Sequence, residues 1–194
     1  MPKGRLEAFT DGVMAIIITI MVLELKVPHG EDLHALVALW QVFLSYALSF
    51  LYVGIYWNNH HHMLHAARTI SAQVLWANLH LLFWLSLLPF STGWMGENHF
   101  APWPVAVLAT NLLCAAIAYT ILMFAIVRCN PRDSGLTEAI GTDAKGKISL
   151  VLYAVSIASA LFINNWLGFV VLFMPAVLWL IPDRRMESVM ARRN

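Results

Sequence analysis

The chain has 194 residues, of which 60% are hydrophobic and only 12% are charged, and its mean hydropathy is +0.69. These values exclude a water-soluble domain, which needs a polar surface. The formal net charge of +1 gives no electrostatic footprint for binding nucleic acid. Two cysteines, Cys114 and Cys129, offer neither a disulfide framework nor the spacing of a metal site. The sequence therefore predicts an integral membrane protein.

The N-terminal stretch RLEAFTDGVMAIIITIMVLELKVP, residues 5–28, places Thr10 and Asp11 at the start of an apolar run. Charged residues precede this run and no small-residue cleavage site follows it, so it is interpreted as a membrane helix and not as a signal peptide. On a helical wheel with Asp11 at zero, an arc from about 80° to about 180° is aliphatic apart from one hydroxyl. This arc contains Thr19, Leu23, Ile16 and Ile20. Asp11 lies outside it.

Hydropathy predicts an all-α integral membrane protein with six transmembrane helices in one domain, residues 1–194. The spans lie near residues 8–27, 35–57, 73–93, 103–127, 148–163 and 166–181. The last two come from one apolar stretch, which as a single helix would be about 50 Å long, too long for a hydrocarbon core of about 30 Å. Asn164 and Asn165 interrupt it near the middle, which favours two spans joined by a tight turn.

The positions of the basic residues agree with six spans. If the N-terminus is cytoplasmic, every lysine and arginine except Lys26 falls on the cytoplasmic side. Such an asymmetry is the usual signature of orientation in a bilayer. We therefore expect a multi-pass protein of the plasma membrane with both termini in the cytoplasm.

A carboxylate near lipid needs partners within the protein, because an unpaired charge there costs several kcal/mol. Candidate partners of Asp11 follow in the next two spans, and Arg5 could offset its charge. The candidates are Trp57, Asn58, His60 and His61 in the second span, and Trp76, Asn78 and His80 in the third. Two interpretations stay open: a structural polar network that joins three helices, which is favoured, or a ligand for a proton or another ion.

The run NNHHHMLH places His61 and His65 four residues apart on one helical face. No cysteine or carboxylate accompanies them, so they are interpreted as anchors at the membrane boundary and not as metal ligands. The spans contain no catalytic constellation, such as a nucleophile elbow or a pair of carboxylates. We expect neither an enzyme nor a cofactor.

Several motifs resemble one known family. Arg5 followed by Phe9-Thr10-Asp11 resembles the Arg-x-x-x-Phe-Ser-Asp signature of the transmembrane protein 175 potassium channels. WNNHH, from Trp57, and WANLHLLFWLSLLPF, from Trp76, resemble the patterns of the family's second and third helices. The resemblance covers roughly residues 5–90. Thr10 departs from the family's serine but keeps its hydroxyl.

This resemblance implies a potassium channel in which the first helix lines the pore. By resemblance, Ile16 occupies the constriction and Thr19 lies one turn further, with Ile20 and Leu23 also lining the pore. The signature residues would hold the first helix against the second and third. This set comprises Arg5, Phe9, Thr10 and Asp11 with Trp57, His60, Trp76 and Asn78.

The family lacks the Thr-Val-Gly-Tyr-Gly filter of ordinary potassium channels, and so does this chain. Family members with twelve spans contain two six-span units and pair as dimers, which implies a homotetramer here. Potassium ions are the expected permeant species and the lipid bilayer the expected surroundings. Two alternatives are a proton-coupled secondary transporter that uses Asp11 and the histidines as a relay, and a structural or sensory membrane protein without transport.

Overall fold

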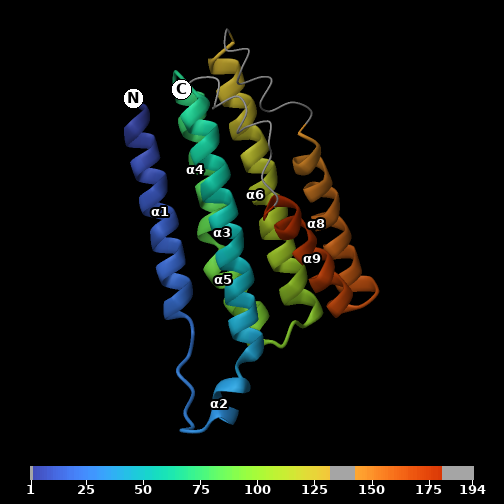
Figure 1. The fold of residues 1–194 in the computed structure, drawn as a ribbon. Coiled ribbons are helices and arrows are strands. Elements are labelled where there is room, and N and C mark those ends of the chain that lie inside the picture. Colours follow the sequence, from blue (N-terminus) through green and yellow to red (C-terminus); the bar gives the residue numbers. More distant parts are fainter. Residues whose placement is uncertain (1, 132–142, 181–194) are drawn as a thin grey trace.

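The computed structural model describes residues 2–131 and 143–180, and the regular elements in this part of the chain are all helices (Figure 1). They are α1 (Lys3–Leu23), α2 (Leu33–Val37), α3 (Trp40–Ala66), α4 (Ala72–Ser86), α5 (Leu88–Glu97), α6 (Pro102–Cys129), α8 (Ala144–Phe162) and α9 (Asn165–Leu180). The predicted all-helical class is confirmed. Among the described residues, four segments are long and apolar enough to cross a membrane, namely α1, α4 with α5, α6 and α8.

Helices α4 and α5 form one apolar segment with a break in the middle. Leu87 ends α4 and precedes α5, and Pro89 lies in the first turn of α5. Proline has no backbone N–H and its ring clashes with the preceding turn, so a regular helix cannot continue through this position. The segment therefore follows one direction through the bundle as two helices.

A tight turn separates α8 from α9, as predicted for the long C-terminal apolar stretch. The side-chain oxygen of Asn164 accepts hydrogen bonds from the backbone N–H of Trp166 (2.8 Å) and Leu167 (3.2 Å). These bonds satisfy two donors at the start of α9. Close packing fixes the hairpin, since a Cβ on Gly168 would lie 2.6 Å from the Cβ of Ala160.

Helix α1 stands at one edge of the bundle and packs against α3, α4 and α5, while α8 and α9 lie on the far side of α6 (Figure 1). The Lys3 ammonium donates to the carbonyls of His65 (3.1 Å) and Ala67 (3.3 Å), so α1 begins where α3 ends. At the opposite end, an ion pair of 2.6 Å joins Lys26 to Glu97. Helices α1 and α3 are therefore antiparallel.

Two helices have bounds that differ from the predicted spans. Helix α1 begins at Lys3 and ends at Leu23, several residues earlier than the predicted span 8–27. Helix α3 continues to Ala66, beyond the predicted end at residue 57, so the His-rich stretch 60–65 is helical. At about 1.5 Å per residue, the 27 residues of α3 form a helix about 40 Å long. This length lets the polar side chains at its C-terminal end lie beyond the hydrocarbon core.

Candidate functional site

One face of α1 is buried against the bundle and the opposite face is open. The buried positions follow helical spacing and are Leu6, Thr10, Met14, Ile17 and Met21. Across the helix, the exposed fractions are 58% for Ile16, 41% for Ile20 and 82% for Leu23, and Thr19 is also exposed. The four predicted pore-lining residues thus share an outward face of the single subunit.

Thr19 contributes the hydroxyl on this outward face. Its Oγ1 donates to the carbonyl oxygen of Ile16 at 2.8 Å, so the proton is used within the helix and the oxygen lone pairs stay available. Ile18 lies on the flank and is partly buried against the core. The outward face therefore combines aliphatic side chains with one hydroxyl oxygen that can still accept a hydrogen bond.

A buried hydrogen-bonded chain joins α1, α4 and α3. The Asn78 amide nitrogen donates to the Thr10 hydroxyl at 2.9 Å, and the Asn78 oxygen lies 2.7 Å from His60 Nε2. Because an amide oxygen only accepts, His60 Nε2 carries the proton of this bond. Thr10 and Asn78 are fully buried and His60 is 2% exposed. These three residues, called the anchor network below, connect α1 to α4 and α3 by hydrogen bonds.

Asp11 contacts one of its predicted partners, Trp57, but at the surface of the subunit and not in its interior. Its carboxylate accepts a hydrogen bond from Trp57 Nε1 at 2.9 Å, but both side chains are exposed at the surface of the subunit. Thr10, and not Asp11, is the buried member of the signature. The reason is geometric, since neighbours on a helix point about 100° apart and only one of them faces the bundle.

Other predicted members of the network lie outside it in the described residues. Arg5 is exposed and forms no ion pair with Asp11, while Phe9 is 50% and Trp76 is 74% exposed. His80 accepts a hydrogen bond from Trp84 Nε1 at 3.0 Å instead of reaching α1. Their roles stay predictions.

The His-rich end of α3 forms an aromatic stack. The ring of His61 stacks on Trp57 with centroids 6.0 Å apart and on His65 with centroids 6.1 Å apart. Within residues 2–131 and 143–180, no group of three or more His, Cys, Asp or Glu side chains is arranged to hold a metal ion.

Sequence reasoning missed a second polar cluster, between α3, α5 and α6. The hydroxyls of Ser49 and Thr92 are 2.5 Å apart, and the Asn111 amide donates to Ser91 Oγ at 3.1 Å. Small polar residues isolated in apolar runs were the available signal, because such residues hydrogen-bond across membrane helices. The cluster holds α5 against its neighbours.

Comparisons with known proteins identify relatives of this chain. The family described as "Endosomal/lysosomal potassium channel TMEM175" matches residues 5–89. A potassium channel of Chryseobacterium sp. (strain P1-3) is 52% identical over 188 residues, covering 97% of each chain. A potassium channel of Chamaesiphon minutus (strain ATCC 27169 / PCC 6605) is 33% identical over 187 residues, 90% of this chain and 91% of the relative.

A solved structure shares the fold as well. The crystal structure of a lysosomal potassium-selective channel TMEM175 homolog from Chamaesiphon minutus has a TM-score of 0.78 and 29% identity to this chain. The match covers 92% of this chain and 96% of that one. These relatives are channels and not enzymes. Since a relative more than 30% identical matches over almost its whole length, the chain belongs to the TMEM175 family.

Proposed function

We propose that this chain is a subunit of a potassium-permeable channel in the plasma membrane. The named relatives are potassium channels, and the matching crystal structure is of a homolog of a lysosomal potassium-selective channel. The observation in this chain that carries the proposal is the two-sided character of α1, buried on one face and open, aliphatic and hydroxyl-bearing on the other.

The subunit in this proposal crosses the bilayer six times as one domain. The spans are α1, α3, the α4–α5 segment, α6, α8 and α9. Helix α3 is not among the four most apolar segments, but its 27 residues are long enough to cross the core, and α9, with 16 residues, is about 24 Å long and spans most of the core. An even number of spans puts both termini on the same side of the membrane, and the basic residues near the ends of α3 and α6 assign that side to the cytoplasm.

Four subunits surround the pathway in this proposal. The outward face of α1 carries large apolar side chains at the edge of one bundle, and a single helix face cannot enclose an ion pathway. Four copies of α1 around a common axis cover these faces and create a closed conduit. The resulting homotetramer has four chains of 21.8 kDa.

Ile16 forms the narrowest ring of this conduit, and Thr19 supplies hydroxyl oxygens one turn away. An apolar ring excludes water when it is narrow, so it acts as a gate by dewetting. An ion that crosses it must shed much of its hydration shell, and potassium loses water at lower cost than sodium. A preference for potassium over sodium follows without a carbonyl filter.

Flux measurements in liposomes test this function. The purified protein is placed in vesicles loaded with potassium chloride, which are then diluted into potassium-free buffer without valinomycin. The vesicles should release potassium down its gradient, and no coupling ion should be required. Potassium movement that needs a proton gradient would instead support the proton-coupled transporter. The absence of any flux from a correctly assembled protein would overturn the proposal.

The oligomeric state needs a separate measurement. Native mass spectrometry in mild detergent should report a mass of about four chains after the micelle is removed. A monomer that still conducts would contradict the role of α1 as one quarter of the pore wall.

A further inference from the structure

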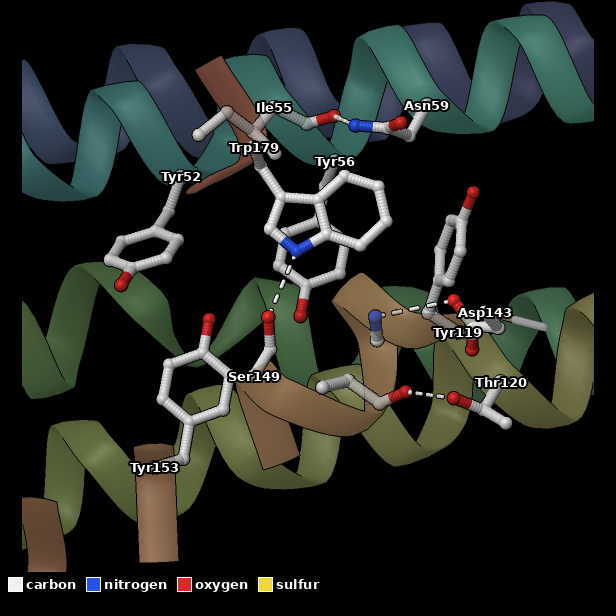
Figure 2. A pocket seen from close by; sticks show the side chains of 12 residues that line it. Tyr52, Ile55, Tyr56, Asn59, Tyr119, Thr120, Asp143, Ser149, Tyr153 and Trp179 are labelled. Atoms are coloured by element: carbon white, nitrogen blue, oxygen red, sulfur yellow. Dashed lines mark hydrogen bonds between the residues drawn. The ribbon is translucent and has the colours of Figure 1, made fainter. Parts of the chain in front are cut away.

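A cavity of about 40 Å³ lies between α3, α6, α8 and α9 (Figure 2). No lining residue comes from α1, α4 or α5, so the cavity is separate from the outward face of α1 and from the anchor network. A volume of 10–15 Å³ accommodates about one water-sized group, so this space accepts a ligand of a few heavy atoms. Its walls show which chemistry that ligand has.

Aromatic rings dominate the walls. Tyr52 and Tyr56 of α3 are directed toward Tyr153 of α8, and Tyr119 and Trp179 approach from α6 and α9 (Figure 2). Centroids are 6.3 Å apart for Tyr52 and Tyr153 and 6.1 Å apart for Tyr56 and Tyr119. Electron-rich ring faces attract cations that come within about 6 Å of the centroid.

Two hydroxyls at the cavity have no hydrogen-bond partner in the described part of the chain. Tyr52 donates its proton to the Leu172 carbonyl, but Tyr56 and Tyr119 form no hydrogen bond with any described residue. Tyr56 is only 8% exposed. A tyrosine hydroxyl without such a bond keeps oxygen lone pairs that can face a cation in the cavity.

The charge of the lining is negative. Asp143 is the one charged residue among the described lining side chains, and it caps α8 by accepting from Gly146 N–H at 3.2 Å. It forms no ion pair within the described residues. Partial burial raises the pKa of its carboxyl, opposed by the Gly146 hydrogen bond and by the charge of Lys147. A half-buried carboxylate is stabilised by a cation beside it.

We propose that this cavity binds a small organic ammonium ion, with Asp143 as counter-charge and the tyrosine and tryptophan rings as cation–π walls. The Trp179 ring already makes a cation–π contact at the edge of the cavity, where Lys145 Nζ lies 5.8 Å from its centroid. The aromatic walls favour an alkylated ammonium over an inorganic ion, which requires a full shell of oxygen ligands.

Isothermal titration of the purified channel with tetramethylammonium chloride, at constant ionic strength, tests the site. The neutral probe tert-butanol has nearly the same shape and should bind at least about tenfold more weakly, because it lacks the charge. Equal binding of the two probes would overturn the proposal. Displacement of tetramethylammonium by an equal concentration of potassium chloride would do so as well, since it would indicate an inorganic cation site.

Matched variants locate the binding. Asp143→Asn keeps a capping side chain but removes the charge and should weaken the affinity about tenfold. Asp32→Asn is the control, because Asp32 caps α2 in the same way, through Ala35 N–H at 3.0 Å, far from the cavity. Tyr119→Leu should weaken binding about threefold, whereas Tyr119→Phe keeps the ring and most of the affinity.

Two outcomes contradict this location. Unchanged affinity in Asp143→Asn would remove the cavity as the site. Affinity lost in Ile16→Asn but kept in Asp143→Asn would place the ammonium ion in the conducting pathway. Isothermal titration measures binding and not conduction, so a failure of this proposal is distinguishable from a failure of the proposed channel function.

Discussion

Replacing Asn78 by alanine removes the amide that connects α1 to α3 through α4. Two hydrogen bonds disappear, of 2.9 Å to Thr10 and 2.7 Å to His60, and both partners are left buried without them. Hydrogen bonds between membrane helices average about 0.6 kcal/mol and reach about 1.7 kcal/mol. For two bonds, the free energy of unfolding should therefore fall by about 1–3 kcal/mol.

Equilibrium unfolding in mixed detergent micelles, followed by circular dichroism, measures this loss. Asn58→Ala is the control, since Asn58 is exposed on α3 and forms no side-chain hydrogen bond with a described residue. It should leave the free energy of unfolding within about 0.5 kcal/mol of the wild type. An Asn78→Ala protein as stable as the Asn58→Ala protein would refute the assignment of the anchor network.

A double-mutant cycle with Thr10→Val isolates the contact between α1 and α4. Valine keeps the shape of threonine but cannot accept the proton of the Asn78 amide. Because the two residues touch, their effects should be less than additive, with an interaction free energy of at least about 0.5 kcal/mol. Strict additivity would mean that the hydrogen bond contributes nothing to holding α1.

Two further predictions concern the pore face and the C-terminal hairpin. In planar bilayers, Ile16→Asn should raise the leak current and reduce the preference for potassium over sodium, because water enters a polar ring more easily than an apolar one. The control Ile18→Ala should change conduction little. The reverse result would mean that α1 is rotated about its axis. Gly168→Ala should lower the free energy of unfolding by about 1–3 kcal/mol, because its Cβ would lie within 2.8 Å of Ala160 backbone atoms. Gly54→Ala, with no atom within 4 Å of the added Cβ, should have little effect on unfolding, and equal losses for both glycines would contradict the close packing of α8 and α9.

Helix α1 was the most predictable part of the fold and of the site. Its outward arc followed from the spacing of Ile16, Thr19 and Leu23 alone, because a helix of 3.6 residues per turn sorts residues onto faces regardless of what packs there. The turn at Asn164 was predictable for an equally simple reason, since the apolar stretch was too long to be one span.

The partners of α1 were harder to predict. Trp76 and Asn78 are two residues apart, so they point about 200° apart on α4 and only one of them can face α1. The apolar residues of α4 do not indicate which, because a membrane helix is apolar on its lipid-facing side as well. Only the packed bundle shows that Asn78 is fully buried and Trp76 is 74% exposed.

Sequence patterns could not predict the tyrosine cavity. Its rings come from positions as far apart as Tyr52 and Trp179, on four different helices, and no local spacing relates them. Each tyrosine alone looks like an ordinary amphipathic residue in a membrane helix. Their gathering depends on the rotation of every helix, which tertiary packing decides.

The two faces of α1 have a consequence for how such a protein can change over time. Stability of the subunit resides in the buried stripe and in the anchor network, while Ile16 and Leu23 bury little surface within their own chain. Substitutions on the open face therefore lower the folding stability little, and loss of folding stability is what limits most sequence change. Descendants of one scaffold can acquire different permeation properties through a few exposed positions, and a protein engineer can search those same positions without redesigning the bundle.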